Sequence, residues 1–270
     1  MKEAVLVCHQ GIGDLIAMCG GIIYLKKYYD RMTLICKEKN TKHLKLFFQD
    51  NDINLIVVHD NLEFIEIQEK VINYFNKTLN DIYISGVCFN YLKKYRRVSI
   101  DIPEYINSNL DKTKGYNINN YIFNMISKFY NDIGLSIDIC CDYLPFKSNK
   151  ISIDLYNLIS KYDIIFIQLK SSDNTKLNIS NILKQYLNDE NTILICNDEN
   201  LYQKESDKYK LCENFIYKNF AYYYDTIINS NKIYVIDSCF SCLIMPLIIS
   251  NKLKAQEIQI INRNNSYKQL

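Results

Sequence analysis

The chain has 270 residues, of which 48% are hydrophobic and 23% are charged, with a formal net charge of +2. These values are ordinary for a globular protein, and a chain of this length can bury one large core or two smaller ones. The nearly balanced charge gives no bulk attraction to nucleic acid or to an anionic membrane, so we expect neither as a partner. No apolar segment reaches the roughly 18–20 residues that a membrane span needs.

The N-terminus begins Met-Lys-Glu and enters a strand-like run without the features of a signal peptide. The ten cysteines are scattered and are not spaced like a disulfide framework, so we expect a cytoplasmic protein with reduced thiols. The three histidines, His9, His43 and His59, form no metal-binding pattern. We therefore predict neither a metal site nor a cofactor.

In the first half of the chain, short aliphatic runs alternate with helical patterns. The runs are too short for typical helices, and their continuous apolar character is typical of parallel strands covered on both faces. The expected strands are 4–8, 32–36, 53–58 and 81–84, and the expected helices are 14–29, 41–49, 64–76 and 117–133. Gly134 is a suitable C-terminal stop for the last helix.

The segment DYLPFKSNK, residues 142–150, breaks this pattern, and the alternation then restarts. The expected strands are 163–169, 192–196, 232–236 and 257–261, and the expected helices are 178–187, 222–229 and 241–249. Two successive alternations predict an α/β fold with two Rossmann-like, doubly wound lobes, residues 1–145 and 146–270, and a cleft between them. One large sheet is the alternative.

The first expected strand leads through His9 into GIGD, residues 11–14. Open parallel sheets bind ligands at the carboxyl ends of their strands, where glycines let the chain turn tightly and a ligand come close. Ile16 replaces the third glycine of a dinucleotide fingerprint, and no P-loop lysine follows. Asp14 therefore either stabilises the start of a helix or serves as a functional carboxylate that takes a proton from a bound hydroxyl.

Two polar segments follow strands in the second half. Lys170, Ser171 and Ser172 supply a positive charge and hydroxyl groups, which suit a diphosphate or form a polar loop without a ligand. Asp237 and Ser238 come between a strand and an apolar helix, whose N-terminus offers free N–H groups to an anion. Ser238 can cap that helix or bind the phosphate.

Cys239 and Cys242 form a C-x-x-C pattern, which alone suggests redox chemistry or half of a zinc site. The sequence has no second ligand pair at metal spacing, and the flanking residues are strongly apolar. We interpret these cysteines as buried structural residues, and we interpret the adjacent pair Cys140 and Cys141 in the same way.

GIGD, followed by GGIIYLKKYYD, resembles the start of glycosyltransferase family nine, the ADP-heptose:lipopolysaccharide heptosyltransferases, and of their relatives in microbes and large DNA viruses. The segments 164–179 and 232–247 follow in the family's order. The resemblance implies a GT-B fold with two Rossmann-like lobes. It implies that Asp14 is the catalytic base and that a lysine and hydroxyl residues near Lys170 hold the donor diphosphate.

The family carries an Asp-Thr-Gly-Leu-x-His-like motif where this chain has Asp237 and Ser238, but Cys239 and Cys242 replace the glycine and the histidine. An acidic residue of the family that contacts the donor ribose would correspond to Asp198 or Glu199. These departures leave the donor contacts open.

From the residues and the resemblance together, we expect a glycosyltransferase that moves a sugar from a nucleotide-diphosphate sugar to a hydroxyl group of a glycan or other acceptor. We expect inversion at the anomeric carbon and no metal, since no Asp-x-Asp near a strand end could hold one. His9, Gly11 and Gly13 would line the acceptor side. The alternatives are a nucleotide-sugar epimerase or hydrolase of the same fold and a non-catalytic nucleotide-sugar-binding protein.

Overall fold

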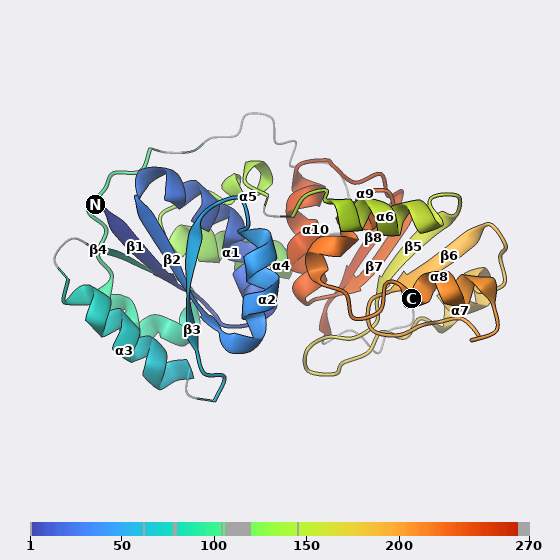
Figure 1. Ribbon diagram of the computed structural model, residues 1–270, viewed down its shortest axis with the longest axis horizontal. Coiled ribbons are helices and arrows are strands. Elements are labelled where there is room, and N and C mark those ends of the chain that lie inside the picture. Colours follow the sequence, from blue (N-terminus) through green and yellow to red (C-terminus); the bar gives the residue numbers. More distant parts are fainter. Residues whose placement is uncertain are drawn as a thin grey trace. The chain divides into compact units, whose positions relative to one another are not determined.

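The computed structural model describes residues 2–61, 63–77, 80–103, 105, 120–144 and 146–263. The chain divides into two compact units, the first made of Met1–Leu110 and Asn124–Pro145 and the second of Asp111–Phe123 and Phe146–Leu270. Each unit contains a four-stranded sheet whose strand pairings are parallel (Figure 1). The prediction of an α/β fold built from two Rossmann-like units is confirmed, and the alternative of one large sheet is wrong.

In the first unit the strand order is β3-β2-β1-β4. Its strands are β1 (Glu3–Val7), β2 (Arg31–Lys37), β3 (Ile53–Val58) and β4 (Asn80–Ile84). Its helices are α1 (Ile12–Leu25), α2 (Thr41–Phe47), α3 (Glu63–Phe75), α5 (Ile139–Asp142) and most of α4 (Asn120–Asp132), with 3-10 segments η1 (Lys26–Tyr28), η2 (Glu38–Asn40) and η3 (Val87–Tyr95).

The central strand β1 of this sheet is covered on both faces, whereas the edge strand β3 is only partly buried. Val5 and Val7 belong to a buried cluster with Val71 of α3, whereas Leu6 between them is also fully buried. Because successive side chains of a strand point to opposite faces, burial of all three means that both faces carry helices. This explains the continuous apolar runs in the sequence.

Helices α1, α2, α3 and α4 lie where the sequence indicated, with boundaries that differ by at most four residues. α1 begins at Ile12, so Asp14 lies inside the first turn and not at the helix boundary. α4 ends at Asp132, and Gly134 has a φ of +79°, the left-handed conformation that commonly follows a helix C-terminus. Residues 117–119 of the helix expected over 117–133 lie outside the described residues.

In the second unit the strand order is β6-β5-β7-β8. Its strands are β5 (Asp163–Gln168), β6 (Thr192–Cys196), β7 (Lys232–Ile236) and β8 (Glu257–Ile261). Its helices are α6 (Lys150–Ile159), α7 (Ser180–Tyr186), α8 (Asp207–Glu213), α9 (Tyr224–Ile228) and α10 (Cys239–Ile249), with the 3-10 segment η4 (Phe220–Tyr223). None of the helices in the described part of the chain is long and apolar enough to cross a bilayer.

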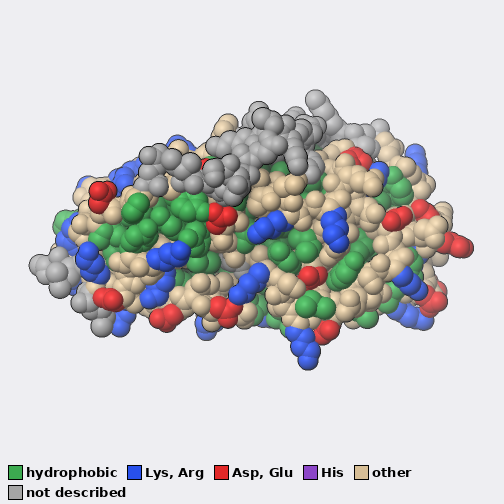
Figure 2. Space-filling model, turned by 90° about the horizontal axis from the view of Figure 1, so that it is seen from above, with side chains coloured by type: hydrophobic (Ala, Val, Ile, Leu, Met, Phe, Trp, Pro, Cys, Tyr) green, Lys and Arg blue, Asp and Glu red, His purple; other side chains and the backbone are tan. Residues whose placement is uncertain are grey.

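On the face shown in Figure 2, lysines and arginines alternate with acidic residues. Within the basic sequence KKYRR, Lys93 lies 3.4 Å from Asp132, and Arg97 donates to the backbone carbonyls of Phe75, Lys77 and Asn80. These contacts bind two of its basic side chains to groups of the protein itself.

Candidate functional site

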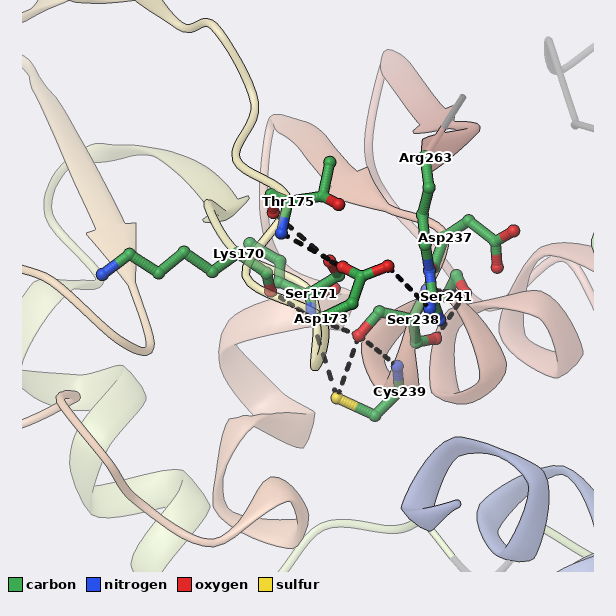
Figure 3. Close-up of polar contacts among 10 residues, drawn as sticks. Lys170, Ser171, Asp173, Thr175, Asp237, Ser238, Cys239, Ser241 and Arg263 are labelled. Carbon is green, nitrogen blue, oxygen red and sulfur yellow. Dashed lines mark hydrogen bonds and ion pairs between the residues drawn. The ribbon is translucent and has the colours of Figure 1, made fainter. Parts of the chain in front are cut away.

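The carboxyl ends of β5 and β7 are neighbours in the second unit's sheet. The chain leaves β5 toward β6 on one side and leaves β7 toward β8 on the other. This reversal is the topological switch point, where open α/β sheets bind their ligands. Figure 3 shows the polar residues that follow the two strands at this point.

Gln168, the last residue of β5, forms hydrogen bonds with both the segment that follows β5 and the segment that follows β7. Its side-chain Nε2 donates to Ser238 Oγ at 2.7 Å and to the carbonyl oxygen of Lys170 at 3.1 Å. Gln168 is 2% exposed, and its Oε1 is buried without a hydrogen-bond partner among the described residues. A buried acceptor left unpaired costs about 1–3 kcal/mol, so the site contains a group that a ligand with O–H or N–H donors would satisfy.

Ser238 is the N-cap of α10, as the sequence allowed. Its hydroxyl accepts from the backbone N–H of Cys239 at 2.6 Å, and its own N–H donates to Ser241 Oγ at 3.0 Å in a capping box. A role in phosphate binding stays a prediction. The eleven-residue helix adds a partial positive charge at its N-terminus, which favours an anion.

Cys239 is half-buried and lies inside this polar cluster, whereas Cys242 is buried. Cys239 Sγ is 3.5 Å from Ser238 Oγ and 3.7 Å from Gln168 Nε2. Burial raises the pKa of the Cys239 thiol above its ordinary value, so the thiol is protonated at neutral pH. Cys140 and Cys141 are buried, as expected.

Lys170 extends away from Ser238 (Figure 3). Its Nζ lies 3.7 Å from Glu199 Oε2 in the loop that follows β6. Asp198, in the same loop, accepts a hydrogen bond from Cys196 Sγ at 2.8 Å. The structure therefore brings Lys170 to the loop of Asp198 and Glu199 and not to the start of α10.

Ser171 is buried and its hydroxyl donates to Asp173, whereas Ser172 is exposed. Asp173 Oδ1 also accepts from the backbone N–H of Thr175 at 3.1 Å, and Asp173 Oδ2 lies 3.4 Å from Arg263 Nη1. The Ser171 hydroxyl, with smaller contributions from Thr175 and the Arg263 charge, holds the pKa of Asp173 well below its usual range. Asp173 is therefore an anion throughout the physiological pH range.

Neither Arg263 nor Asp173 was predicted from the sequence as a site residue. Arg263 follows β8, and its Nε donates to the carbonyl oxygen of Asp237 at 2.6 Å. Asp237 itself is 8% exposed; its carboxylate is turned away from Ser238 (Figure 3), and burial raises its pKa. No local motif marks Arg263, and only the pairing of β8 with β7 brings it to this place.

In the first unit, Asp14 lies in the first turn of α1 and is half-buried. Gly11 is the N-cap, without a side chain to cap the helix, and Gly13 is in the first turn. A Cβ added to Gly11 would lie 2.6 Å from Asp14 Oδ2, so the carboxylate folds back over the N-cap residue. There it complements the positive end of the helix, and its role as a base stays a prediction.

His9 lies between the carboxyl ends of β1 and β4. Its Nε2 accepts from the backbone N–H of Cys88 at 3.0 Å, and its ring packs edge-on against Phe129 with centroids 5.2 Å apart. Since Nε2 accepts, a neutral ring carries its proton on Nδ1. A Cβ on Gly86, whose φ is +86°, would lie 2.4 Å from His9 Cδ2, so the ring fills the space beside this glycine.

No three His, Cys, Asp or Glu side chains in the described ranges are grouped so that they could hold a metal ion. The polar residues that the structure does bring together are those at the β5–β7 edge and, separately, those that follow β1. Of the residues predicted from sequence, the first group contains Ser171, Asp237 and Ser238.

Compared by sequence, the chain matches no family model and no curated protein. Compared by structure, it is similar to the glycosyl transferase family 9 from Veillonella parvula DSM 2008, with a TM-score of 0.51 and 11% identity over 97% of this chain and 86% of that chain. It is also similar to the E. coli ADP-heptose lps heptosyltransferase II, with a TM-score of 0.51 and 11% identity over 99% of this chain and 94% of that chain. At this identity the likeness shows a shared fold, which is the fold that the resemblance in sequence implied.

Proposed function

We propose that the chain is a glycosyltransferase that moves a sugar from a nucleotide-diphosphate sugar to a hydroxyl group of a glycan or other acceptor. The observation that carries this proposal is the Gln168–Ser238 hydrogen bond, which joins the loop after β5 to the N-terminus of α10 at the switch point. A diphosphate leaving group suits such a helix N-terminus. The fold that the chain shares with the family 9 glycosyl transferase and the heptosyltransferase II also supports the proposal.

The donor would bind to the second unit. Its diphosphate would lie at the start of α10, near Ser171, Asp237 and Ser238. Lys170 and Asp198 would contact the nucleoside side, since both belong to loops that meet at the end of β6. The partial positive charge of α10 would stabilise the negative charge that develops on the leaving diphosphate, without a metal ion.

The acceptor would bind to the first unit, beside the loop that follows β1. Asp14 would take the proton from the attacking hydroxyl group, and attack from the face opposite the leaving diphosphate would invert the anomeric carbon. His9 would donate a hydrogen bond from Nδ1 to an acceptor oxygen, because its Nε2 is already occupied by the Cys88 N–H. Gly11 and Gly13 would let the acceptor approach the backbone.

The test is a transfer assay with a panel of nucleotide sugars and hydroxyl acceptors, with the wild type, Asp14→Asn and Asp207→Asn. Asp207 is the matched control, because it is an acidic residue in the first turn of α8. We expect Asp14→Asn to lose at least about a hundredfold in transfer rate while keeping its donor affinity, and Asp207→Asn to behave as the wild type.

Three results would contradict the proposal in different ways. Normal turnover of Asp14→Asn would reduce Asp14 to a helix-stabilising residue. Release of free sugar or of an isomer without any acceptor would identify a hydrolase or an epimerase. Binding of a nucleotide sugar by the wild type without conversion of any acceptor in the panel would favour a binding protein.

A further inference from the structure

Arg263 and Asp173 form an ion pair at the edge of the sheet where α10 begins. Arg263 Nη1 lies 3.4 Å from Asp173 Oδ2, and Arg263 Nε donates to the carbonyl oxygen of Asp237 at 2.6 Å. Asp237 directly precedes Ser238, the N-cap of α10. The guanidinium is therefore held by the backbone of the residue that precedes the N-cap, and Figure 3 shows its ion pair with Asp173.

Both partners remain accessible. The side chain of Arg263 is 37% exposed and that of Asp173 is 50% exposed. Arg is well suited to bind phosphate, because its planar guanidinium presents several N–H donors at once. Lys170, the cation chosen from sequence, reaches toward Glu199 instead. Arg263 is thus the cation that the structure attaches to the start of α10.

Two further features at the same edge point to a ligand that has both an anionic group and hydroxyl groups. α10 has eleven residues, so its N-terminus carries the partial positive charge of a full helix. Gln168, 2% exposed, contacts the cap residue Ser238 and has an Oε1 without a partner in the described part of the chain. An unpaired acceptor needs an O–H or N–H donor, which sugars and nucleosides supply.

The carboxylate of Asp173 is the anion that pairs with Arg263 in this structure. Its carboxylate is oriented by the Ser171 hydroxyl and the Thr175 N–H, so the loop holds it in place without help from Arg263. A diphosphate carries more negative charge than one carboxylate and can accept several of the guanidinium hydrogen bonds. It would therefore compete with Asp173 for the same group.

We propose that Arg263 binds the diphosphate of the donor, and that Asp173 is an internal anion that occupies Arg263 until the diphosphate displaces it. This inference rests on the proposed function and adds to it the residue that holds the leaving group. Donor binding is then an exchange of ion-pair partners, in which no covalent bond changes. The negative charge of Asp173 lowers the affinity for the donor.

The test measures binding by calorimetry at low ionic strength, with inorganic pyrophosphate and with ADP, GDP, UDP and CDP as probes. The variants are Arg263→Gln, Arg263→Lys, Asp173→Asn and the double variant Arg263→Gln/Asp173→Asn. Arg31→Gln is the matched control, because Arg31 Nη1 pairs with Glu3 Oε1 at 3.0 Å in the first unit. Thermal melting of each variant reports whether it is folded.

We expect Arg263→Gln to bind the probes at least about tenfold more weakly and Arg263→Lys to be intermediate. Asp173→Asn should bind about threefold to tenfold more tightly, since asparagine can still accept from Ser171 and Thr175 but carries no charge. The double variant should bind no more tightly than Arg263→Gln, because the gain from Asp173→Asn acts through Arg263. Arg31→Gln should equal the wild type.

Unchanged binding by Arg263→Gln, or a gain in the double variant equal to that in Asp173→Asn, would overturn this inference and leave the proposed function standing. If Arg263→Gln does not fold, Arg263→Lys and Asp173→Asn decide, and unchanged binding by both counts against the inference. A wild type that binds none of the probes would overturn the proposed function and the inference together.

Discussion

Gln168 Nε2 and Ser238 Oγ are 2.7 Å apart, although 70 positions separate the two residues in the sequence. The bond crosses from the end of β5 to the cap of α10, and the same nitrogen also reaches the carbonyl oxygen of Lys170. One side-chain amide thus sets the position of two connections that meet at the switch point. The geometry of the candidate site depends on it.

Gln168→Leu should therefore destabilise the second unit. The substitution keeps a buried side chain of similar size but removes the donor to Ser238 Oγ and to the Lys170 carbonyl, together with the unpaired Oε1. We expect the two lost hydrogen bonds to outweigh the removal of the unpaired acceptor, with a net loss of about 1 kcal/mol in the free energy of unfolding. Urea denaturation measures the loss. Gln259→Leu is the control, because the Gln259 side-chain amide donates to the side chain of Glu257, two residues earlier in β8, at 2.8 Å, and its loss should change stability far less. Equal losses in the two variants would show that the Gln168 amide has no special role.

Gly86→Ala should disrupt the loop beside His9. The glycine has a φ of +86°, and a Cβ there would lie 2.4 Å from His9 Cδ2. Gly134→Ala is the matched control, since Gly134 has a φ of +79° but its Cβ would meet nothing closer than Arg96 Nη2 at 4.0 Å. Thermal denaturation should show a loss of about 1–2 kcal/mol from backbone strain in Gly134→Ala and a clearly larger loss in Gly86→Ala.

His9→Ala should remove the steric part of this effect. In the His9→Ala background, Gly86→Ala should destabilise the protein only about as much as Gly134→Ala does in the wild type, because backbone strain remains and the clash is gone. If Gly86→Ala lowers the free energy of unfolding equally with His9 and with Ala at position 9, the histidine ring is not the reason why position 86 needs a glycine.

Most of the strands could be predicted because burial on both faces makes them apolar, as in β1, β4 and β6. The strands at 192–196, 232–236 and 257–261 have the bounds that the sequence indicated. The start of α1 was placed too late, because Gly11 is an N-cap without a capping side chain and the only polar signal is Asp14. α6 was missed although Asn149 and Ser152 form a capping box, because the preceding segment reads as a break in the pattern.

The site was harder to predict than the fold. Ser238 follows a strand and precedes an apolar run, so a local pattern reveals its position. The direction of the Lys170 side chain is set by Glu199, which lies on another loop. Arg263 reaches the site only because β8 pairs with β7, and no spacing in the sequence predicts that contact.

The stabilising effect of Asp173 should depend on pH. Its folded-state pKa is depressed, chiefly by the Ser171 hydroxyl, so ionised Asp173 favours the folded state. This contribution is present at every pH above the unfolded-state pKa of about 4 and is lost as the pH falls toward the lower folded-state value. Asp173→Asn should therefore be less stable than the wild type at pH 7, and the difference should shrink below about pH 4. Urea denaturation at pH 7, 5, 4 and 3 measures it, and a difference independent of pH would contradict the assignment.

Tyr217 should be a site where substitution stabilises the protein. Its side chain is 81% exposed, so it contributes little burial, yet its φ is +54°, a left-handed conformation that bulky residues rarely adopt. The backbone N–H of Tyr217 donates to the carbonyl oxygen of Asn197 at 2.6 Å, which holds the residue in place and does not need the ring. Asparagine tolerates this conformation, as Asn174 and Asn251 do in this chain at φ values of 65° and 54°.

Tyr217→Asn should therefore raise the free energy of unfolding by about 0.5–1 kcal/mol and raise the melting temperature by a few degrees. Tyr217→Phe is the control, because it keeps the strain and the ring and should leave stability unchanged. Thermal denaturation of the three proteins in one buffer makes the comparison. A Tyr217→Asn variant that melts below the wild type would mean that the exposed ring stabilises the fold by more than its backbone strain destabilises it.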